Sequence, residues 1–314
     1  ERWALERLEN KLVIKNPDCT LREFVESFPG GFFSWEGEWA TDRRASGKRA
    51  SPQQCREKQR LLEKQILPEL GNVPLTAITK AAVKTLRNKL FRTGYSSSTI
   101  NHTLSCLRSV LEAAEDAGLI RGLPKIERVA ERWTDRGILT PEEVKALFSS
   151  PWTDHRAYTA NLLAAVSGLR QGEILALQRQ NVRPGYLDIL RSWNQRENTL
   201  NETTKNGRSR YIPIPSKVEK EIHCLLNTSP WRAPESFVFY TPAMATKPME
   251  GKVAREGLYK ALADTGITEE ERRKRRIDFH SWRHWFNSIL LNQKVPLQKV
   301  QAITGHLTKE MVQR

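Results

Sequence analysis

The chain has 314 residues, enough for two folded domains, because single cores usually stop growing near about 250–300 residues. Its 51 Lys and Arg residues outnumber its 36 Asp and Glu residues and give a formal net charge of +15. The excess makes a polyanion such as nucleic acid the first partner to consider. A ribosomal protein, a membrane-surface binder or a merely soluble protein would also fit this charge.

The sequence argues against a metal site and against a membrane-spanning segment. The cysteines lie far apart, without a CxxC pair or a nearby histidine at zinc-ligand spacing, so we expect reduced thiols and no metal site. The longest apolar stretch, around Leu162 to Leu169, falls far short of the about 20 residues that span a bilayer, and no signal peptide is recognisable. We therefore expect a cytoplasmic protein without a membrane partner.

Residues 51–118 have the apolar spacing of a small helical domain. The predicted helices and their boundaries are Gln53–Ile66 before Pro68 and Gly71, Ala81–Phe91 after the N-cap Thr79, and a third helix between the caps Ser96–Ser98 and Gly118. An amphipathic helix, Trp3 to Ile14, and an aromatic, Gly-rich stretch, Phe28 to Trp39, come first. The sequence assigns neither of them a role.

A polar segment without periodicity, from Leu123 to Leu139, is typical of a linker. Thr140, Pro141 and Glu143 then form a capping box that starts a helix. Farther along, Tyr186–Leu190 and Arg210–Ile214 are predicted strands, and Asn206-Gly207 favours a tight hairpin. We expect this second domain to be mainly α with a small antiparallel sheet, an α+β fold.

Basic residues stand at two turns of this second domain. Gly168 breaks one helix and places Arg170 near the start of the next, where a phosphate is attracted. A helix-turn-helix corner with a solvated arginine is the alternative. Lys205 lies beside the predicted hairpin turn, from which it can reach a ligand, although exposed lysines in turns are common.

Histidines and an arginine come together near the end of the chain. His280 and Arg283 are three residues apart and share one helical face. His284, the next histidine, fits a hydrogen-bonded packing residue. His306 follows a glycine break after the predicted helix Leu297–Ile303, and a single Gly-His pair means little by itself.

In this order, Arg, Lys, His-x-x-Arg and Gly-His resemble the active-site pattern of the tyrosine recombinases, or integrase family. Ile66–Gly71 and Ser98–Asn101 also resemble that family's core-binding domain, so the resemblance covers about residues 20–314. It implies a two-domain DNA clamp. The expected parts are an N-terminal helix of unknown role in 1–19, a helical core-binding domain in 20–122, a linker in 123–138 and a catalytic domain in 139–314.

The resemblance assigns a role to each residue of the pattern. Arg170 and Arg283 would grip the scissile phosphate, and Lys205 would be the general acid for the departing 5′ oxygen. The rest of the pocket would be His280, His306 and Glu173, the last as a carboxylate that steadies the arginines. This chemistry needs no metal ion or cofactor, since guanidinium groups can fork onto the phosphate oxygens.

The nucleophile is the point at which the sequence departs from the family. A tyrosine is expected nine residues after His306, one position beyond Arg314, while Tyr211, Tyr240 and Tyr259 stand in the wrong places to replace it. We interpret this as truncation or loss of an end. The 314-residue chain is therefore expected to bind DNA without forming the covalent intermediate.

The basic run Arg272, Arg273, Lys274, Arg275 and Arg276 is close enough to the pattern to follow a DNA backbone, with a solvated loop as the alternative. The resemblance further implies double-stranded recombination sites, a homo-tetramer on synapsed DNA and accessory DNA-bending proteins. Such an enzyme would integrate or excise a mobile element, of phage or transposon type, at the nucleoid of a bacterial or phage-infected cell.

Two other functions remain open on the sequence. A type IB topoisomerase shares this chemistry but reseals the same strand, and both size and the integrase-like first domain argue against it. A noncatalytic DNA-binding regulator would keep the fold and occupy DNA alone. The complete set of five basic side chains argues against that, because binding does not need all of them.

Overall fold

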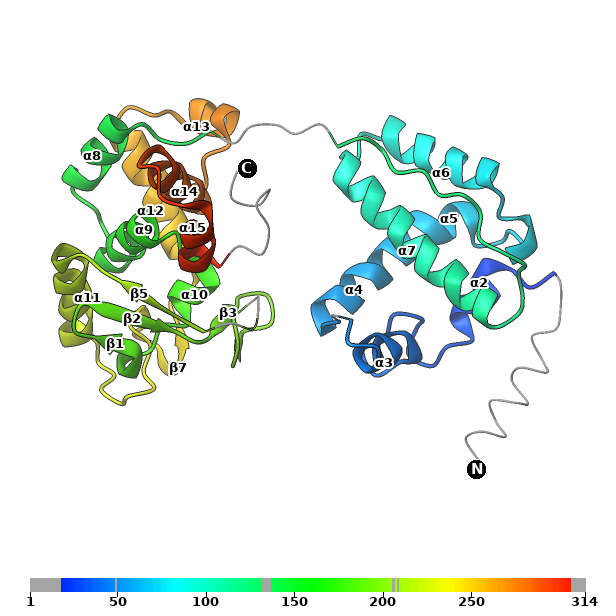
Figure 1. The fold of residues 1–314 in the computed structure, drawn as a ribbon, viewed down its shortest axis with the longest axis horizontal. Helices are drawn as coiled ribbons and strands as arrows, with labels where there is room; N and C mark the ends of the chain where they lie inside the picture. The colour runs from blue at the N-terminus through cyan, green and yellow to red at the C-terminus, as the bar shows by residue number, and fades with distance from the viewer. Residues whose placement is uncertain (1–17, 49, 132–136, 205–206, 208, 306–314) are drawn as a thin grey trace. The chain divides into compact units, whose positions relative to one another are not determined.

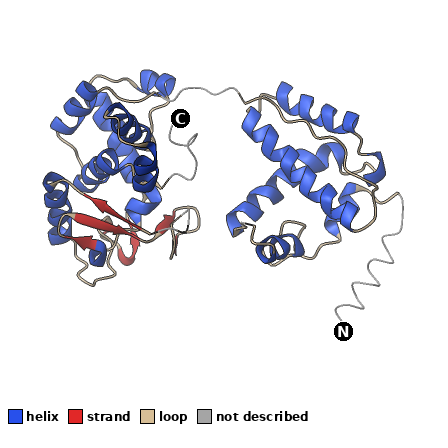
Figure 2. Ribbon diagram, viewed as in Figure 1, coloured by secondary structure: helices blue, strands red, loops and turns tan. Residues whose placement is uncertain are grey.

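The computed structural model describes residues 18–48, 50–131, 137–204, 207 and 209–305. The chain divides into two compact units, Glu1–Trp133 and Thr134–Arg314, each with its own hydrophobic core (Figure 1). Within the described ranges, helices dominate both units and strands occur in the second (Figure 2). The mainly α fold with a small antiparallel sheet is therefore confirmed. The helix predicted at Trp3 to Ile14 lies outside the described residues.

The first unit is built from helices joined by short turns. Its elements are α2 (Leu21–Glu26), α3 (Glu38–Ala45), α4 (Pro52–Leu61), the π-helical turn η1 (Leu62–Ile66), α5 (Leu67–Leu70), the 3-10 turn η2 (Leu75–Ala77), α6 (Lys80–Arg92) and α7 (Ser97–Asp116). The predicted N-caps are confirmed, since the Thr79 and Ser96 hydroxyls accept hydrogen bonds from the third residue after each. Gly118, at φ 74°, follows the last helix as predicted.

Pro68 does not end the helical segment as the sequence suggested. The chain widens into the π turn of η1 before Pro68 and then continues as α5 to Leu70. A widened turn accommodates the missing proline N–H and the bulk of its ring, both of which a regular α-helix tolerates poorly. The helical path therefore ends only at Gly71.

The polar segment after α7 lies along the first unit. The Asn101 side chain donates to the Val129 carbonyl at 2.9 Å and accepts from the Val129 backbone N–H at 2.8 Å. Leu123, Ile126 and Val129 pack against the core of that unit. A segment without helical or strand periodicity thus packs along the first unit, where the buried Asn101 amide pairs with both backbone polar groups of Val129.

The second unit surrounds the helix α9. Its elements are α8 (Pro141–Ser149), α9 (His155–Ser167), α10 (Gln171–Leu175), η3 (Arg179–Asn181), β1 (Val182–Arg183), β2 (Tyr186–Ile189), β3 (Ser192–Asn194), β4 (Thr199–Asn201), β5 (Arg210–Pro213), α11 (Ser216–Thr228), β6 (Tyr240–Thr241), β7 (Met244–Pro248), α12 (Gly251–Asp264), α13 (Glu269–Arg275), α14 (Ser281–Asn292) and α15 (Leu297–Thr304). The capping box predicted at Thr140 and Glu143 is confirmed. Helix α9 packs against α11, α12 and α14.

The two predicted strands pair with each other. β2 and β5 are antiparallel, with Leu187 opposite Ile212, and β1 flanks β2 in a three-stranded sheet. Between them the chain forms a further hairpin, β3–β4, that the sequence analysis did not predict. Asn206 of the predicted turn lies outside the described residues. In the part of the chain that the structure describes, none of the helices is both long and apolar enough to cross a membrane.

Candidate active site

The corner between α9 and α10 forms where the sequence predicted a helix break. Gly168 follows α9 in the left-handed conformation, at φ 62°. A Cβ at this position would lie 2.7 Å from Phe286 Cδ1 of α14, closer than packed atoms approach. Glycine therefore permits both the turn and the close packing of α14, the helix that carries Arg283.

A buried hydrogen bond fixes α14 against α9. The Trp282 indole N–H donates to the Asn161 side-chain oxygen at 2.8 Å, and the Asn161 amide group donates to the carbonyl oxygens of Ala157 and Ala254. Trp282 is 2% exposed. Because α14 is held in this rotation, the next residue, Arg283, is directed at the α9–α10 corner.

Arg283 is a buried cation held by backbone carbonyls. It is only 2% exposed, and its terminal nitrogens donate to the carbonyl oxygens of Gly168, at 2.7 Å, and Thr304. Burial and the neighbouring positive charge of Arg170 lower the pKa of this guanidinium to about 9. Arg283 therefore remains charged at pH 7, but at a cost in desolvation that a bound anion would offset.

Arg170 is paired with Glu173 at the start of α10. The Glu173 carboxylate accepts from the Arg170 backbone N–H at 2.9 Å and from its guanidinium at 3.0 Å. A further Arg170 nitrogen donates to the Gly305 carbonyl at 3.4 Å. The side chain of Glu173 is 1% exposed and that of Arg170 18%, so a ligand can reach the arginine but not the carboxylate.

The structure adds Arg210, at the start of β5, which the sequence analysis missed. Its terminal nitrogens donate to the two Glu173 carboxylate oxygens at 3.2 and 2.8 Å, and its Nε donates to the Ile303 carbonyl at 3.0 Å. Burial raises the pKa of Glu173, but the hydrogen bonds and charge of Arg210 outweigh burial, so the pKa lies below its usual value. Glu173 is thus a carboxylate that two arginines share.

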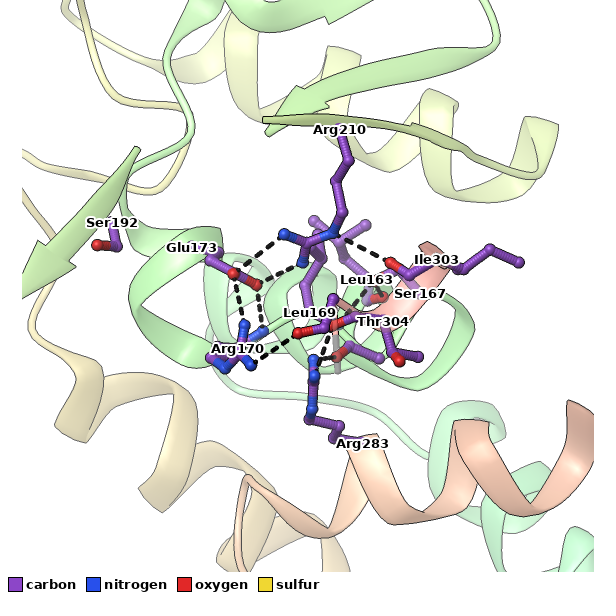
Figure 3. Close-up of polar contacts among 12 residues, drawn as sticks. Leu163, Ser167, Leu169, Arg170, Glu173, Ser192, Arg210, Arg283, Ile303 and Thr304 are labelled. Carbon is purple, nitrogen blue, oxygen red and sulfur yellow. Dashed lines mark hydrogen bonds and ion pairs between the residues drawn. The ribbon is translucent and has the colours of Figure 1, made fainter. Parts of the chain in front are cut away.

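We call Arg170, Glu173, Arg210 and Arg283 the arginine cluster (Figure 3). Its three guanidiniums face a single carboxylate, which leaves a net charge of +2 within the set. The residues come from α10, β5 and α14, and they converge on the end of α15. An anion with several oxygens, such as a phosphodiester, would balance this charge and could accept from more than one guanidinium.

Of the histidines in the sequence pattern, His280 lies within the described residues. His280 immediately precedes α14 and is exposed, and its backbone N–H donates to Asp278 at 2.8 Å. Its ring lies edge-on to that of His284, with 5.2 Å between the centroids. The structure therefore places His280 at the surface, beside the start of the helix that carries Arg283. Lys205 and His306 lie outside the described residues.

The basic run 272–276 is largely engaged within the protein. Arg272 and Arg273 both pair with Glu269, and Arg275 pairs with Glu271. Arg275 also donates two hydrogen bonds of 2.7 Å to Glu143, which raises its pKa further, so this side chain ties α13 to the start of α8. The exposed fraction of the side chain is 12% for Arg272 but 75% for Arg273.

The chemistry of the cluster suits an anion and not a metal ion. Over the described ranges, no group of three or more His, Cys, Asp or Glu side chains is arranged to hold a metal ion. The groups that converge at the cluster are guanidinium donors and one carboxylate already held by two of them. Such an arrangement can bind an anion through charge-assisted hydrogen bonds.

Comparisons with known families match both units. Residues 138–314 match the phage integrase family, and residues 45–91 match the phage integrase N-terminal SAM-like domain. Among individual proteins, the chain is 24% identical over 230 residues to the tyrosine recombinase XerC of Rhodospirillum centenum, an alignment that covers 70% of this chain and 62% of that protein. It is 27% identical over 261 residues to the integrase of Mycobacterium phage L5, covering 80% and 67% of the two chains.

Solved structures share the fold at low sequence identity. The Tn1549 transposon integrase, in complex with a circular intermediate DNA, superposes with a TM-score of 0.72 at 18% identity, and the match covers 93% of each chain. A lambda integrase tetramer bound to a Holliday junction gives 0.68 at 15% identity, covering 98% of this chain and 79% of that one. The chain spans only about three fifths of the length of the XerC relative.

Proposed function

This chain belongs to the phage integrase family of tyrosine recombinases, and on that basis we propose that it serves site-specific DNA recombination. The reaction would cleave and rejoin DNA through a 3′-phosphotyrosyl intermediate and so integrate or excise a mobile element. One observation carries the proposal, the buried excess of positive charge in the arginine cluster. A scissile phosphate brings the negative charge that this cluster lacks.

We propose that Arg170 and Arg283 bind the non-bridging oxygens of the scissile phosphate. Attack on a phosphodiester builds negative charge on these oxygens, so fixed donors stabilise the transition state more than the ground state. Glu173 would hold the Arg170 guanidinium in place through the hydrogen bond of 3.0 Å. Because the cluster is held by protein groups before DNA arrives, little reorganisation is needed when charge develops.

We propose that the remaining pattern residues handle protons. Lys205 would protonate the departing 5′ oxygen. His280 and His306 would complete the pocket, with His280 accepting the proton of the attacking phenol, which is mostly neutral at pH 7. The exposed position of His280 is compatible with this role, because the nucleophile and the DNA must approach from outside the buried cluster.

The nucleophile itself belongs to the proposal. A tyrosine at the position after Arg314 would bond to the 3′ phosphate and conserve the bond energy for resealing by another strand. A polypeptide limited to these 314 residues would bind its site and form no adduct. We propose this for the 314-residue polypeptide alone.

We propose double-stranded recombination sites as the main partner, bound by a homo-tetramer at the nucleoid, with accessory DNA-bending proteins. The net charge of +15 supports a polyanionic partner. Within the run 272–276, Arg273, Lys274 and Arg276 are the residues we propose to contact the backbone, since all three are exposed. If six to ten phosphates are neutralised, affinity should fall by about 10³ to 10⁵ between 50 and 200 mM salt.

The test is the formation of a covalent adduct on DNA that carries the end of the element. The 314-residue chain and a chain extended through its natural coding sequence would be incubated with this DNA and run on a denaturing gel. We expect an adduct only with the extended chain. Tight binding without an adduct in either chain would favour the noncatalytic regulator, and relaxation of supercoiled DNA of any sequence would favour a topoisomerase.

A further inference from the structure

The end of α15 is held by three arginines from three different elements. The carbonyl oxygens of Ile303, Thr304 and Gly305 are consecutive along the chain, and they accept hydrogen bonds from Arg210, Arg283 and Arg170, respectively. The last carbonyls of a helix have no partner within the helix and carry a partial negative charge. The three guanidiniums supply these carbonyls with the hydrogen-bond donors that the helix itself lacks.

Arg210 and Arg170 each donate to both Glu173 and the end of α15, but Arg210 does so with three side-chain hydrogen bonds of 2.8 to 3.2 Å, whereas the bond from Arg170 to Gly305 is 3.4 Å long. The two terminal nitrogens of Arg210 donate to Glu173, and its Nε donates to Ile303. Through Glu173 it reaches Arg170, and through Ile303 it reaches the helix end that leads to His306 in the sequence. The planar guanidinium of Arg210 therefore links Glu173 to the end of α15.

Gly305 lies beside the guanidiniums of Arg210 and Arg170. Gly305 lies in the left-handed conformation, at φ 67°, and a Cβ there would meet Arg210 at 3.5 Å and Arg170 at 3.9 Å. The side chain of Arg210 is mostly buried, and three donors on it are directed at protein oxygens. Arg210 is thus turned toward the interior and not toward a ligand.

We propose that Arg210 is a positioning residue of the recombination reaction. It would fix the end of α15 against Glu173 and Arg170, so that the guanidiniums of Arg170 and Arg283 meet one phosphate in a single geometry. This inference rests on the proposed function, since it concerns the same pocket. Misplacement of reacting groups by about 1 Å can cost on the order of 100-fold in rate, which gives a positioning residue a large effect without substrate contact.

A purely structural ion pair predicts something different. Removing one partner of a buried ion pair destabilises the folded protein, because the other charge stays buried without that partner. Replacing Arg210 would then change global stability and leave the pocket geometry of the folded protein unchanged. A positioning role instead predicts a local loss of order at the end of α15 in a protein that remains folded.

The first arm of the test needs neither DNA nor catalysis. Amide hydrogen exchange would be followed in the 314-residue chain, in Arg210→Met and in the control Arg183→Met, which removes another carboxylate-paired arginine from the same sheet. We expect exchange at the last turn of α15 to rise about tenfold or more in Arg210→Met, with the centre of α14 unchanged. The control should match wild type at both places. Equal protection of α15 in all three would overturn the proposal.

The second arm measures adduct formation by the extended chain. Arg210→Met should slow the single-turnover rate by about 10- to 100-fold while DNA affinity stays within about threefold, and Arg210→Lys should recover part of the rate. In a double-mutant cycle, the effects of Arg210→Met and Glu173→Gln should be less than additive. Additive effects, or a rate loss explained entirely by weaker binding, would overturn the proposal.

The two arms separate this inference from the proposed function. If the wild-type extended chain forms no adduct, the proposed function fails, and the exchange measurement alone decides whether Arg210 fixes the end of α15. If adduct forms in wild type and in Arg210→Met at the same rate, recombination stands and the role of Arg210 is refuted.

Discussion

Two groups of arginines in the second unit differ in how their charge is balanced. In the arginine cluster, Arg170 and Arg210 share one carboxylate, and Arg283 donates to backbone carbonyls. In the run 272–276, Arg272, Arg273 and Arg275 pair with glutamates three or four residues away on the same helix. The run 272–276 looks the more basic of the two groups in the sequence, but in the fold its charge is the more nearly neutralised.

The difference follows from the range of the contacts. Helix neighbours at three and four residues are fixed by the sequence itself, so the Glu269–Glu271 stretch partly neutralises the arginines that follow it. Apart from the pair Arg170 and Glu173, the hydrogen-bonded partners of the cluster lie 21 to 135 residues apart along the chain, and only the fold brings them together. Net charge therefore has to be summed over residues that lie close together in the fold. Summed in this way, the excess positive charge coincides with the proposed phosphate site.

The largest effect on stability should come from the single carboxylate of the cluster. Glu173→Gln removes the only charge in the set that opposes the three guanidiniums, so we expect a loss of about 3–5 kcal/mol in the free energy of unfolding. Urea denaturation at pH 7 measures it. Glu269→Gln in α13 is the matched control, and a midpoint as low as that of Glu173→Gln would remove the distinction between the two groups.

The titration of Glu173 should make the free energy of unfolding depend on pH. The pKa of Glu173 is lowered in the folded state, so its stabilising contribution is fully present above the unfolded carboxyl pKa, about 4.3, and is lost as pH falls through the folded value. The stability difference between wild type and Glu173→Gln should therefore be constant near neutrality and shrink below about pH 4.3. A difference that grows on acidification would contradict the assignment.

The next effect concerns the rate. Arg283→Lys keeps a cation but loses the forked donor geometry, so we expect adduct formation by the extended chain to slow by about 100-fold or more. Unfolding would be measured in parallel, because the carbonyls of Gly168 and Thr304 lose donors. A folded Arg283→Lys variant that reacts at the wild-type rate would exclude this guanidinium from the transition state.

The smallest effects should distinguish members of the run 272–276. Arg275→Ala should lower stability by about 1.5 kcal/mol, because Glu143 and the Ile138 carbonyl lose a charged donor, with the salt dependence of DNA binding unchanged. Arg273→Ala should leave stability unchanged and reduce the slope of log affinity against log salt by about 1. The opposite assignment of these two effects would show that exposure does not identify the DNA-contacting arginines.

Local signals allowed part of this structure to be predicted. The capping box at Thr140 and the caps Thr79 and Ser96 were correct because they depend on residues within one helical turn. The break at Gly168 was correct because a left-handed residue needs glycine. Arg170, Glu173 and Arg283 were found from the motif pattern, which does not depend on knowing their contacts.

Long-range contacts were beyond the sequence analysis. Arg210 and Ile212 are two residues apart in β5 and therefore lie on the same face of the strand. Because Ile212 is buried, the strand pattern already indicated that Arg210 needs a partner for its charge. Its partners, Glu173 of α10 and the Ile303 carbonyl of α15, are set by how these helices pack against β5. In the first unit, Phe24, Phe28 and Phe32 form a chain of edge-to-face contacts that gives the aromatic stretch a structural role.

The central claim is that the arginine cluster binds one particular phosphate. Neutral methylphosphonates would replace single phosphates along the DNA site, and the affinity of the 314-residue chain would be measured for wild type and Arg170→Gln. In wild type we predict that methylphosphonate at one position per strand lowers DNA affinity by about 10- to 100-fold. This loss should largely disappear in Arg170→Gln, because the guanidinium that pairs with the charge of that phosphate is gone. An equal loss in both proteins at that position, or no single sensitive phosphate, would contradict the account.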